Sequence, residues 1–343
     1  MDPETTPETT SIEAHTSAPI EQPVPEAVPV HRSLVQPLIG FAFLSVSVLG
    51  GIGIITALVA TPSYEPKGQL AAAAAARAEP FKNLEIQATS AYVYDVRRDS
   101  ELYGRNASAQ LPLASLTKVM LVLAAAEVLS PDSLVTVSRE AVERGGGGLT
   151  WGEEWKVRDL IDFTLITSSN TGAEALAEAA RPLLAQKYPE GSEANATIWR
   201  MNALAQELGM NETYFLNASG LDESPTQAGA QGSARDIATL FAYALRTNPD
   251  LFSGTTHSDV TLGPVNFPER SAHNTNNALA DIDGLIMGKT GTTDLAGGNL
   301  AIAFLGGEQR PIVVIVLGST PEGRFEDIKK LITAARTAVS QDR

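Results

Sequence analysis

Apolar positions along the chain change their spacing several times, and each spacing predicts a different element. Residues 90–96 (SAYVYDV) alternate in the manner of a β-strand. Residues 116–129 are apolar almost all round, which predicts a helix buried on every side. Helical patterns then continue to about Arg246, interrupted by the flexible glycine run 145–148.

Strand-like patterns return late in the chain. Residues 284–292, 299–305 and 311–318 predict three strands, and the amphipathic stretch 322–339 predicts a closing helix. An early strand, a helical middle, late strands and a packing helix indicate an α/β (α+β) sandwich, with a sheet flanked by helices and an inserted helical lobe. We place this domain at residues 84–343.

The chain before this domain has three different compositions. Residues 1–37 form an acidic, Pro/Glu/Thr-rich tail that we expect to be disordered. Residues 38–60 carry no charge, and as a helix of roughly 35 Å they would cross a bilayer core of about 30 Å. We therefore predict a transmembrane helix there and a juxtamembrane linker at 61–83. A cleaved signal peptide is the alternative. The flanking charges do not decide the orientation, so an extracytoplasmic domain is expected on functional grounds.

Composition excludes several classes of function. The net charge is −15, and no basic stripe is present that could neutralise a nucleic-acid backbone. The chain has no cysteine, which excludes disulfides, thiolate metal sites and thiol catalysis. Its four histidines form no metal-binding motif. We expect no cofactor, no metal and no nucleic-acid partner.

A Ser-x-x-Lys motif opens the predicted buried helix. Residues three apart share a helix face, so the amine of Lys118 can reach the hydroxyl of Ser115. A serine is a weak nucleophile until a base takes its proton, and lysine is such a base only if its pKa falls. Burial, the helix dipole and a second cation at Lys289 would each lower it. In the alternative interpretation Ser115 is only an N-cap and Lys118 reaches solvent.

A Ser-x-Asn motif follows in the helical middle. Ser168-Ser169-Asn170 lies between two helical patterns, where it would face the nucleophile across a cleft. Ser168 could relay a proton to a leaving amine, and Asn170 could hold the substrate backbone and the lysine amine. The alternative is a simple helix N-cap, a position that Ser and Asn both favour.

A Lys-Thr-Gly motif lies on the first late strand. Lys289, Thr290 and Thr292 would receive a terminal carboxylate, while Gly291, with Gly288, would let a substrate backbone approach. Gly-Lys-Thr also occurs in phosphate-binding loops, but that motif needs four residues between its two glycines. Only three residues separate Gly284 from Gly288, which excludes such a loop.

The order of the three motifs is typical of serine acyl-enzymes, and the chain resembles the D-alanyl-D-alanine carboxypeptidases, the low-molecular-mass penicillin-binding proteins of peptidase family S11. The resemblance covers about residues 87–339. It rests on these blocks: LPLASLTK (111–118), LGM (208–210), FLNASGLD (215–222), SARDIA (233–238), NTN (274–276) and GLIMGKTG (284–291).

The resemblance implies the fold of the serine β-lactamases and penicillin-binding transpeptidases, with an antiparallel sheet. It also implies that Ser115 is acylated by peptidoglycan stem peptides ending in D-Ala-D-Ala, and by β-lactams, with Lys118 as general base. The backbone N–H groups of Ser115 and Thr292 would form the oxyanion hole. Thr292 and Thr171 depart from the family's usual residues, and the C-terminal β-domain and anchor helix of many members are not expected here. The N-terminal helix would then tether a single-pass protein of the bacterial cell membrane.

Three alternatives stay open. A class A-like β-lactamase would need a deacylating glutamate, and Glu207 has the spacing for it, although LGM (208–210) fits a helix end better, with a strand at 213–215. An endopeptidase of the same family would use the same acyl-enzyme, and the sequence does not distinguish it from a carboxypeptidase. An inactive cell-wall binding module would have lost a motif residue, which is not the case here.

Overall fold

A computed structural model describes residues 79–342 of the chain. The predicted tail (1–37), membrane span (38–60) and most of the linker (61–83) lie outside the described residues. Within the described part, no helix is long and apolar enough to cross a bilayer. Phe81, near the end of the predicted linker, stacks on Tyr103 with ring centroids 5.1 Å apart, so ordered packing begins a few residues before Leu84.

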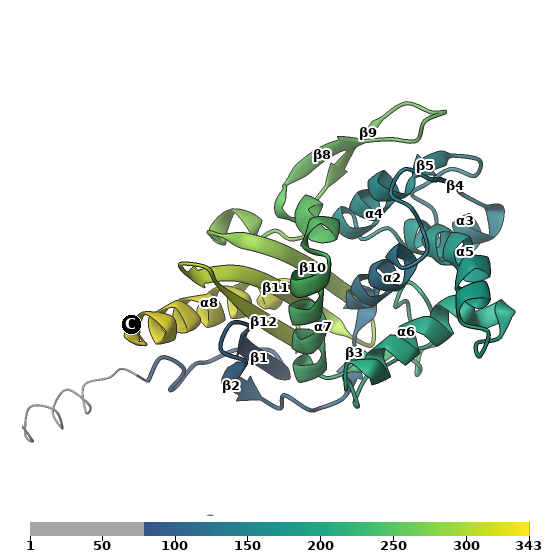
Figure 1. Ribbon diagram of the computed structural model, residues 1–343. Helices are drawn as coiled ribbons and strands as arrows, with labels where there is room; N and C mark the ends of the chain where they lie inside the picture. Colours follow the sequence, from purple (N-terminus) through teal and green to yellow (C-terminus); the bar gives the residue numbers. More distant parts are fainter. Residues whose placement is uncertain (1–78, 343) are drawn as a thin grey trace, which may run out of the picture. The chain divides into compact units, whose positions relative to one another are not determined.

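The domain is built on a five-stranded antiparallel sheet with the order β10-β11-β12-β1-β2 (Figure 1). Its strands are β1 (Ser90–Asp95), β2 (Ser100–Arg105), β10 (Leu285–Thr293), β11 (Gly297–Gly307) and β12 (Arg310–Ser319). Four of them match the predicted strands to within a few residues. The edge strand β2 was not predicted, because its half-exposed sequence SELYGR carries only a weak apolar pattern.

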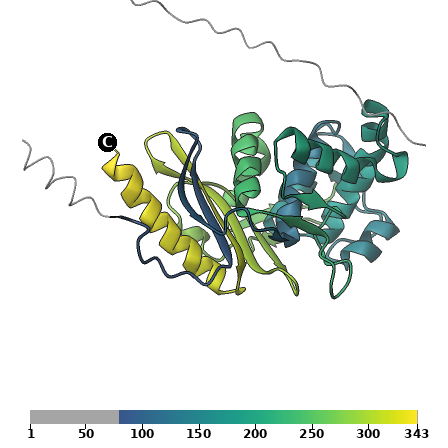
Figure 2. The same ribbon diagram turned by 90° about the horizontal axis from the view of Figure 1, so that it is seen from below.

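Both faces of the sheet are covered. Even-numbered side chains of β12 from Ile312 to Val316 pack in one core, and odd-numbered ones from Val313 to Leu317 pack in the other. Helix α8 (Gly323–Gln341) covers the first face, and α7 (Ala234–Thr247) lies on the second, next to a lobe of helices (Figure 2). A strand buried on both faces reads as a continuous apolar run, here IVVIVL.

The predicted helical middle forms the lobe. Its helices are α2 (Thr117–Ala126), α3 (Arg139–Gly145), α4 (Val157–Ile166), α5 (Asn170–Lys187) and α6 (Ala196–Glu207). As expected from its sequence, α2 is buried nearly all round, although it ends at Ala126 and not at Leu129. It contacts α4, α5 and α6, so residues at its start are held on several sides.

Shorter elements complete the described part. The small sheets pair β3 (Leu111–Pro112) with β7 (Ala230–Gly232) and β6 (Tyr214–Phe215), β4 (Leu134–Thr136) with β5 (Glu154–Lys156), and β8 (Asp259–Leu262) with β9 (Arg270–His273). Short 3₁₀ helices are η1 (Ala114–Leu116), η2 (Glu193–Asn195), η3 (Pro249–Thr256) and η4 (Leu279–Asp281).

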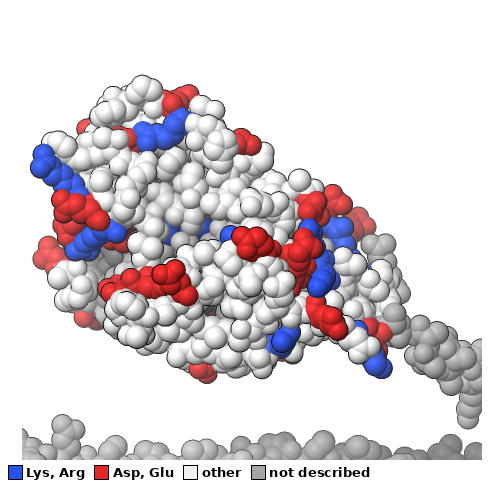
Figure 3. Space-filling view, turned by 180° about the vertical axis from the view of Figure 1, so that it is seen from behind, with Lys and Arg blue, Asp and Glu red and all other residues white. Residues whose placement is uncertain are grey.

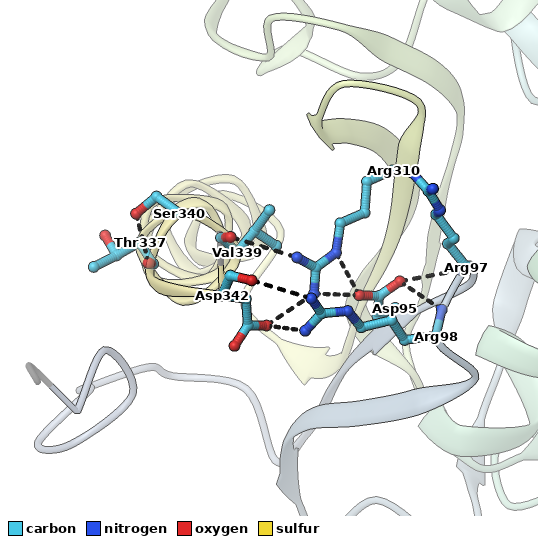
Figure 4. Close-up of polar contacts among 8 residues, drawn as sticks. All are labelled: Asp95, Arg97, Arg98, Arg310, Thr337, Val339, Ser340 and Asp342. Carbon is cyan, nitrogen blue, oxygen red and sulfur yellow. Dashed lines mark hydrogen bonds and ion pairs between the residues drawn. The ribbon is translucent and has the colours of Figure 1, made fainter. Parts of the chain in front are cut away.

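A buried ion pair fastens the end of α8 to the sheet (Figure 4). Arg310 of β12 donates from Nε to Asp95 of β1 at 2.6 Å, and its Nη2 lies 3.0 Å from Asp342. Asp95 is fully buried, so removing Arg310 alone would leave a buried charge without its partner.

On the face shown in Figure 3, charged side chains form scattered groups, some acidic and some mixed. The Lys and Arg side chains form no continuous basic stripe there.

Candidate active site

Ser115 lies in a tight turn directly before the buried helix. The turn is the 3₁₀ helix η1, and α2 begins two residues later at Thr117. Ala114 takes a left-handed conformation with φ of 49°, and its carbonyl accepts a hydrogen bond from Thr117 Oγ1 at 2.7 Å. Ser115 therefore precedes the helix that we expected it to open. Its side chain caps neither η1 nor α2.

Lys118 is buried completely and points at the Ser115 hydroxyl. Its Nζ lies 2.8 Å from Ser115 Oγ, 2.8 Å from Asn170 Oδ1 and 2.7 Å from the carbonyl oxygen of Ser219. The alternative interpretation, an N-cap serine beside a solvent-facing lysine, is wrong. The reason is that α2 has packed neighbours on all sides, which leaves the lysine no route to water.

Burial lowers the pKa of the Lys118 amine to about 7, with the carboxylate of Glu174 acting in the opposite direction. A neutral amine has two N–H donors and one lone pair. The carbonyl oxygens of Asn170 and Ser219 can only accept, so they take the two donors. The lone pair is left for the proton of the Ser115 hydroxyl, which is the arrangement that a general base requires.

The three side chains of the Ser-Ser-Asn segment each have a different partner. Ser169 Oγ accepts from the backbone N–H of Gly172 at 3.0 Å and so caps α5. The neighbouring side chains, which do not cap the helix, reach the two buried lysines. Asn170 reaches Lys118, and Ser168, held at a left-handed φ of 60°, reaches Lys289. The N-cap interpretation therefore holds for Ser169 alone.

Lys289 on β10 is the second buried amine. It donates to Ser168 Oγ and to the Thr290 carbonyl, both at 2.8 Å. Burial lowers its pKa well below the usual value, and the charges of Lys118 and Arg324 lower it further. We expected Lys289 to depress the pKa of Lys118. Burial is the largest cause of the lowered pKa at both amines, and the repulsion between them favours the neutral form of either one.

Gly291 also has a packing role that was not predicted from the sequence. A Cβ at this position would lie 2.9 Å from the Leu113 carbonyl oxygen and 3.3 Å from the Ser115 nitrogen. The glycine thus lets β10 pack against the nucleophile turn. At Gly288 a Cβ would meet Ile302 and Asn276 at ordinary contact distances. These contacts do not require a glycine at 288, and the approach of a substrate backbone to this strand stays a prediction.

Thr290 and Thr292 place hydroxyls along the same strand. Thr290 Oγ1 lies 2.6 Å from Thr275 Oγ1, within the NTN block. Thr292 Oγ1 donates to the Gly291 carbonyl at 2.8 Å and is contacted by Arg324 Nη1, which also donates to the Gly291 carbonyl at 2.8 Å. Burial lowers the pKa of the Arg324 guanidinium.

Sequence reasoning missed Arg324 and Ser219. Arg324 lies in the first turn of α8, far from any motif, and its only sequence signal is its position at the start of a predicted helix. Ser219 acts through its carbonyl, to which its side chain gives no clue. Gly220 beside it has φ of 79°, and a Cβ there would lie 2.0 Å from the Ala114 carbonyl oxygen. The absence of a side chain at Gly220 lets this loop pack closely against the turn that carries Ser115.

The three motifs thus meet at one place, as predicted. All eight predicted site residues lie in this cluster: Ser115, Lys118, Ser168, Asn170, Lys289, Thr290, Gly291 and Thr292. Among the described residues, no group of three or more His, Cys, Asp or Glu side chains is placed to hold a metal ion.

Comparison with known proteins gives a consistent result. The family profile for D-alanyl-D-alanine carboxypeptidases matches residues 73–320. The D-alanyl-D-alanine carboxypeptidase DacC of Escherichia coli is 30% identical over 241 residues, which is 66% of this chain and 56% of DacC. DacB2 of Mycobacterium tuberculosis is 30% identical over 233 residues, 67% of this chain and 75% of the relative.

Solved structures share the fold. Penicillin-binding protein D2 of Listeria monocytogenes, determined with cefotaxime bound, superimposes with a TM-score of 0.62 at 29% identity, covering 74% of this chain and 98% of the other. The chain spans little more than half the length of DacC. The family profile nevertheless covers most of the chain, including all three motifs, and the chain belongs to the D-alanyl-D-alanine carboxypeptidase family, peptidase family S11.

Proposed function

We propose that this protein is a serine-type D-alanyl-D-alanine carboxypeptidase that acts on peptidoglycan stem peptides. The observation that carries the proposal is the fully buried Lys118 amine, 2.8 Å from the Ser115 hydroxyl, with its two other neighbours both acceptors. In this geometry the lone pair of the neutral amine faces the Ser115 hydroxyl and can accept its proton. Family membership supports the same chemistry.

In the proposed reaction, Ser115 Oγ attacks the carbonyl carbon of the penultimate D-Ala while its proton passes to Lys118. The backbone N–H groups of Ser115 and Thr292 stabilise the oxyanion. The C–N bond then breaks, and the leaving D-Ala amine takes the proton through Ser168. Water hydrolyses the Ser115 ester in a second step. β-Lactams acylate Ser115 by the same attack, with the ring nitrogen as the retained leaving group.

Cationic and hydroxyl groups at the end of β10 suit the substrate's terminal carboxylate. Lys289 and Arg324 carry the charge, and Thr290 and Thr292 supply the hydroxyls. Arg324 is partly buried, and a charge-assisted hydrogen bond to a carboxylate is stronger there than in water. Asn170 would hold the substrate backbone on the opposite side of the cleft.

The direct test is release of D-Ala. The purified full-length chain should liberate free D-Ala from a stem pentapeptide ending in D-Ala-D-Ala and leave a matched pentapeptide ending in D-Ala-L-Ala intact. A cross-linked muropeptide dimer in the same assay separates carboxypeptidase from endopeptidase activity. Absence of D-Ala release, together with absence of dimer cleavage, would contradict the proposal.

The pH dependence of acylation follows from Lys118. Because burial brings its pKa to about 7, the amine is a base above this pH and an ammonium ion below it. The rate of labelling by a fluorescent penicillin should therefore rise through pH 7 and fall about tenfold for each further pH unit below it. Stopped-time labelling from pH 5 to pH 9 measures the profile. A flat profile across pH 7 would show that another group accepts the proton.

The β-lactamase alternative requires a glutamate beside Ser115, and Glu207 is not placed for that role. This residue ends α6, its side chain is 57% exposed, and it pairs with Arg200. Gly209, with φ of 72°, follows the C-cap as predicted. Glu207→Ala should leave steady-state penicillin hydrolysis within about twofold of wild type, because the Glu207 side chain faces solvent and Arg200 and has no contact with Ser115 or Lys118 among those found. A large loss in this hydrolysis assay would favour the β-lactamase.

We also propose that residues 38–60 anchor the protein in the bacterial cell membrane as a single span, with the catalytic domain on the extracytoplasmic side. The length and lack of charge of this stretch support the anchor, and the location of peptidoglycan supports the orientation. Protease protection in spheroplasts tests it: added protease should digest the catalytic domain.

A further inference from the structure

Glu174 is a buried carboxylate to which the proposed reaction gives no task. It lies on α5 one turn after Asn170, so the two side chains share a helix face. Asn170 on that face contacts the Lys118 amine at 2.8 Å. Glu174 is only 7% exposed, and acidic side chains are rarely buried to this degree without a partner.

The partner of Glu174 is the loop that also holds Lys118. The hydroxyl of Ser219 acts on Glu174 and lowers its pKa, while the Ser219 carbonyl accepts from Lys118 Nζ at 2.7 Å. Behind this loop lies a cavity of about 320 Å³, lined in part by Glu174, Ser219 and Asp222. Ser219 thus contacts Lys118 and borders the same cavity as Glu174.

Charge explains why a carboxylate belongs at this place. The cluster brings together the amines of Lys118 and Lys289 and the guanidinium of Arg324, all of them largely removed from water. The charge of Glu174 raises the pKa of Lys118, against the larger effect of burial. The pKa of Glu174 itself is raised, mainly by burial. The other charged groups that act on Glu174 or line the cavity are Arg144, Glu178, Asp222 and Glu223.

We propose that Glu174 is a positioning residue of the active site, whose buried carboxylate balances the positive charge that Lys118 acquires when it takes the proton of Ser115. The inference rests on the proposed function. Glu174 forms no bond with the substrate and keeps its charge throughout. The Ser115 proton passes to Lys118 and on to the leaving amine, and between these transfers the ammonium ion lies beside a fixed counter-charge.

The test compares pH profiles of acylation by a fluorescent penicillin. In Glu174→Gln the midpoint of the acid limb should move to lower pH by roughly half a unit or more, because the ammonium form of Lys118 has lost its counter-charge. The plateau rate should also fall several-fold, because a base of lower pKa is a weaker proton acceptor. Glu174→Asp, with a carboxylate shorter by one methylene, should shift the midpoint in the same direction by less.

Glu178→Gln is the matched control. Glu178 lies one further turn along α5 and accepts a hydrogen bond from Ser138 at 2.6 Å. The control should keep the wild-type midpoint. A merely structural role for Glu174 would lower the melting temperature without a graded shift in midpoint, so thermal unfolding is followed for every variant. If Glu174→Gln does not fold, the midpoint of Glu174→Asp decides.

The outcomes distinguish failure of the inference about Glu174 from failure of the proposed function. If the wild-type chain is acylated but the Glu174 variants keep its midpoint, the inference about Glu174 is wrong and the proposed function stands. If the wild-type chain is neither acylated nor releases D-Ala, the proposed function itself fails, and the inference fails with it.

Discussion

Ser115→Ala should abolish both covalent labelling by a fluorescent penicillin and release of D-Ala from a stem pentapeptide. The substitution removes one oxygen atom from a turn whose backbone is fixed by its neighbours, so the fold should survive. Without that oxygen no acyl-enzyme can form, and Lys118 loses the group whose proton it accepts. Any labelling left after denaturing electrophoresis would have to come from another nucleophile.

Ser169→Ala is the matched control for this experiment. Ser169 lies in the active-site region but its hydroxyl caps α5, accepting from the Gly172 N–H. Loss of an N-cap costs about 1 kcal/mol of stability. The control should therefore unfold at a slightly lower temperature and still be labelled. Persistent labelling of Ser115→Ala would disprove the assignment of the nucleophile.

Lys118→Met should lower the acylation rate by about two to four orders of magnitude, the usual contribution of a general base. Methionine fills most of the buried volume and has no amine. It leaves the Asn170 side-chain oxygen and the Ser219 carbonyl without their donor, so some loss of stability is also expected. Labelling time courses at high penicillin concentration measure the remaining rate.

Lys187→Met is the control for the lysine experiment. Lys187 ends α5, is half exposed, and pairs with Glu127. Its loss should change neither labelling nor turnover. A Lys118→Met enzyme acylated within tenfold of the wild-type rate would show that Ser115 is activated by another base.

Periodicity predicted much of this fold because the long elements bury whole faces. The three late strands have strand-like apolar patterns and the final helix an amphipathic one, and each was found within a few residues of its expected bounds. β2 was not predicted because its side chains are half-buried or exposed and its sequence shows little apolar pattern. The 3₁₀ turn at Ser115 escaped because its shape depends on Ala114, which has a conformation that alanine rarely adopts.

The motif residues of the active site were predictable, and their supporting residues were not. Short motifs keep their spacing because the residues meet within one helix turn or one strand. Arg324 and Ser219 meet the motifs only through the tertiary fold. Glu174 lies one turn after Asn170 on α5, but its burial is not visible in the helix pattern.

The two glycines that flank the nucleophile have a consequence for altering this enzyme by mutation. Gly220 and Gly291 both pack closely against the turn that carries Ser115. At Gly220 there is no room for even a methyl group. Variation in acyl-group preference must therefore come from exposed side chains near Ser115. A combinatorial library should hold both glycines constant and randomise Thr292, whose side chain is exposed.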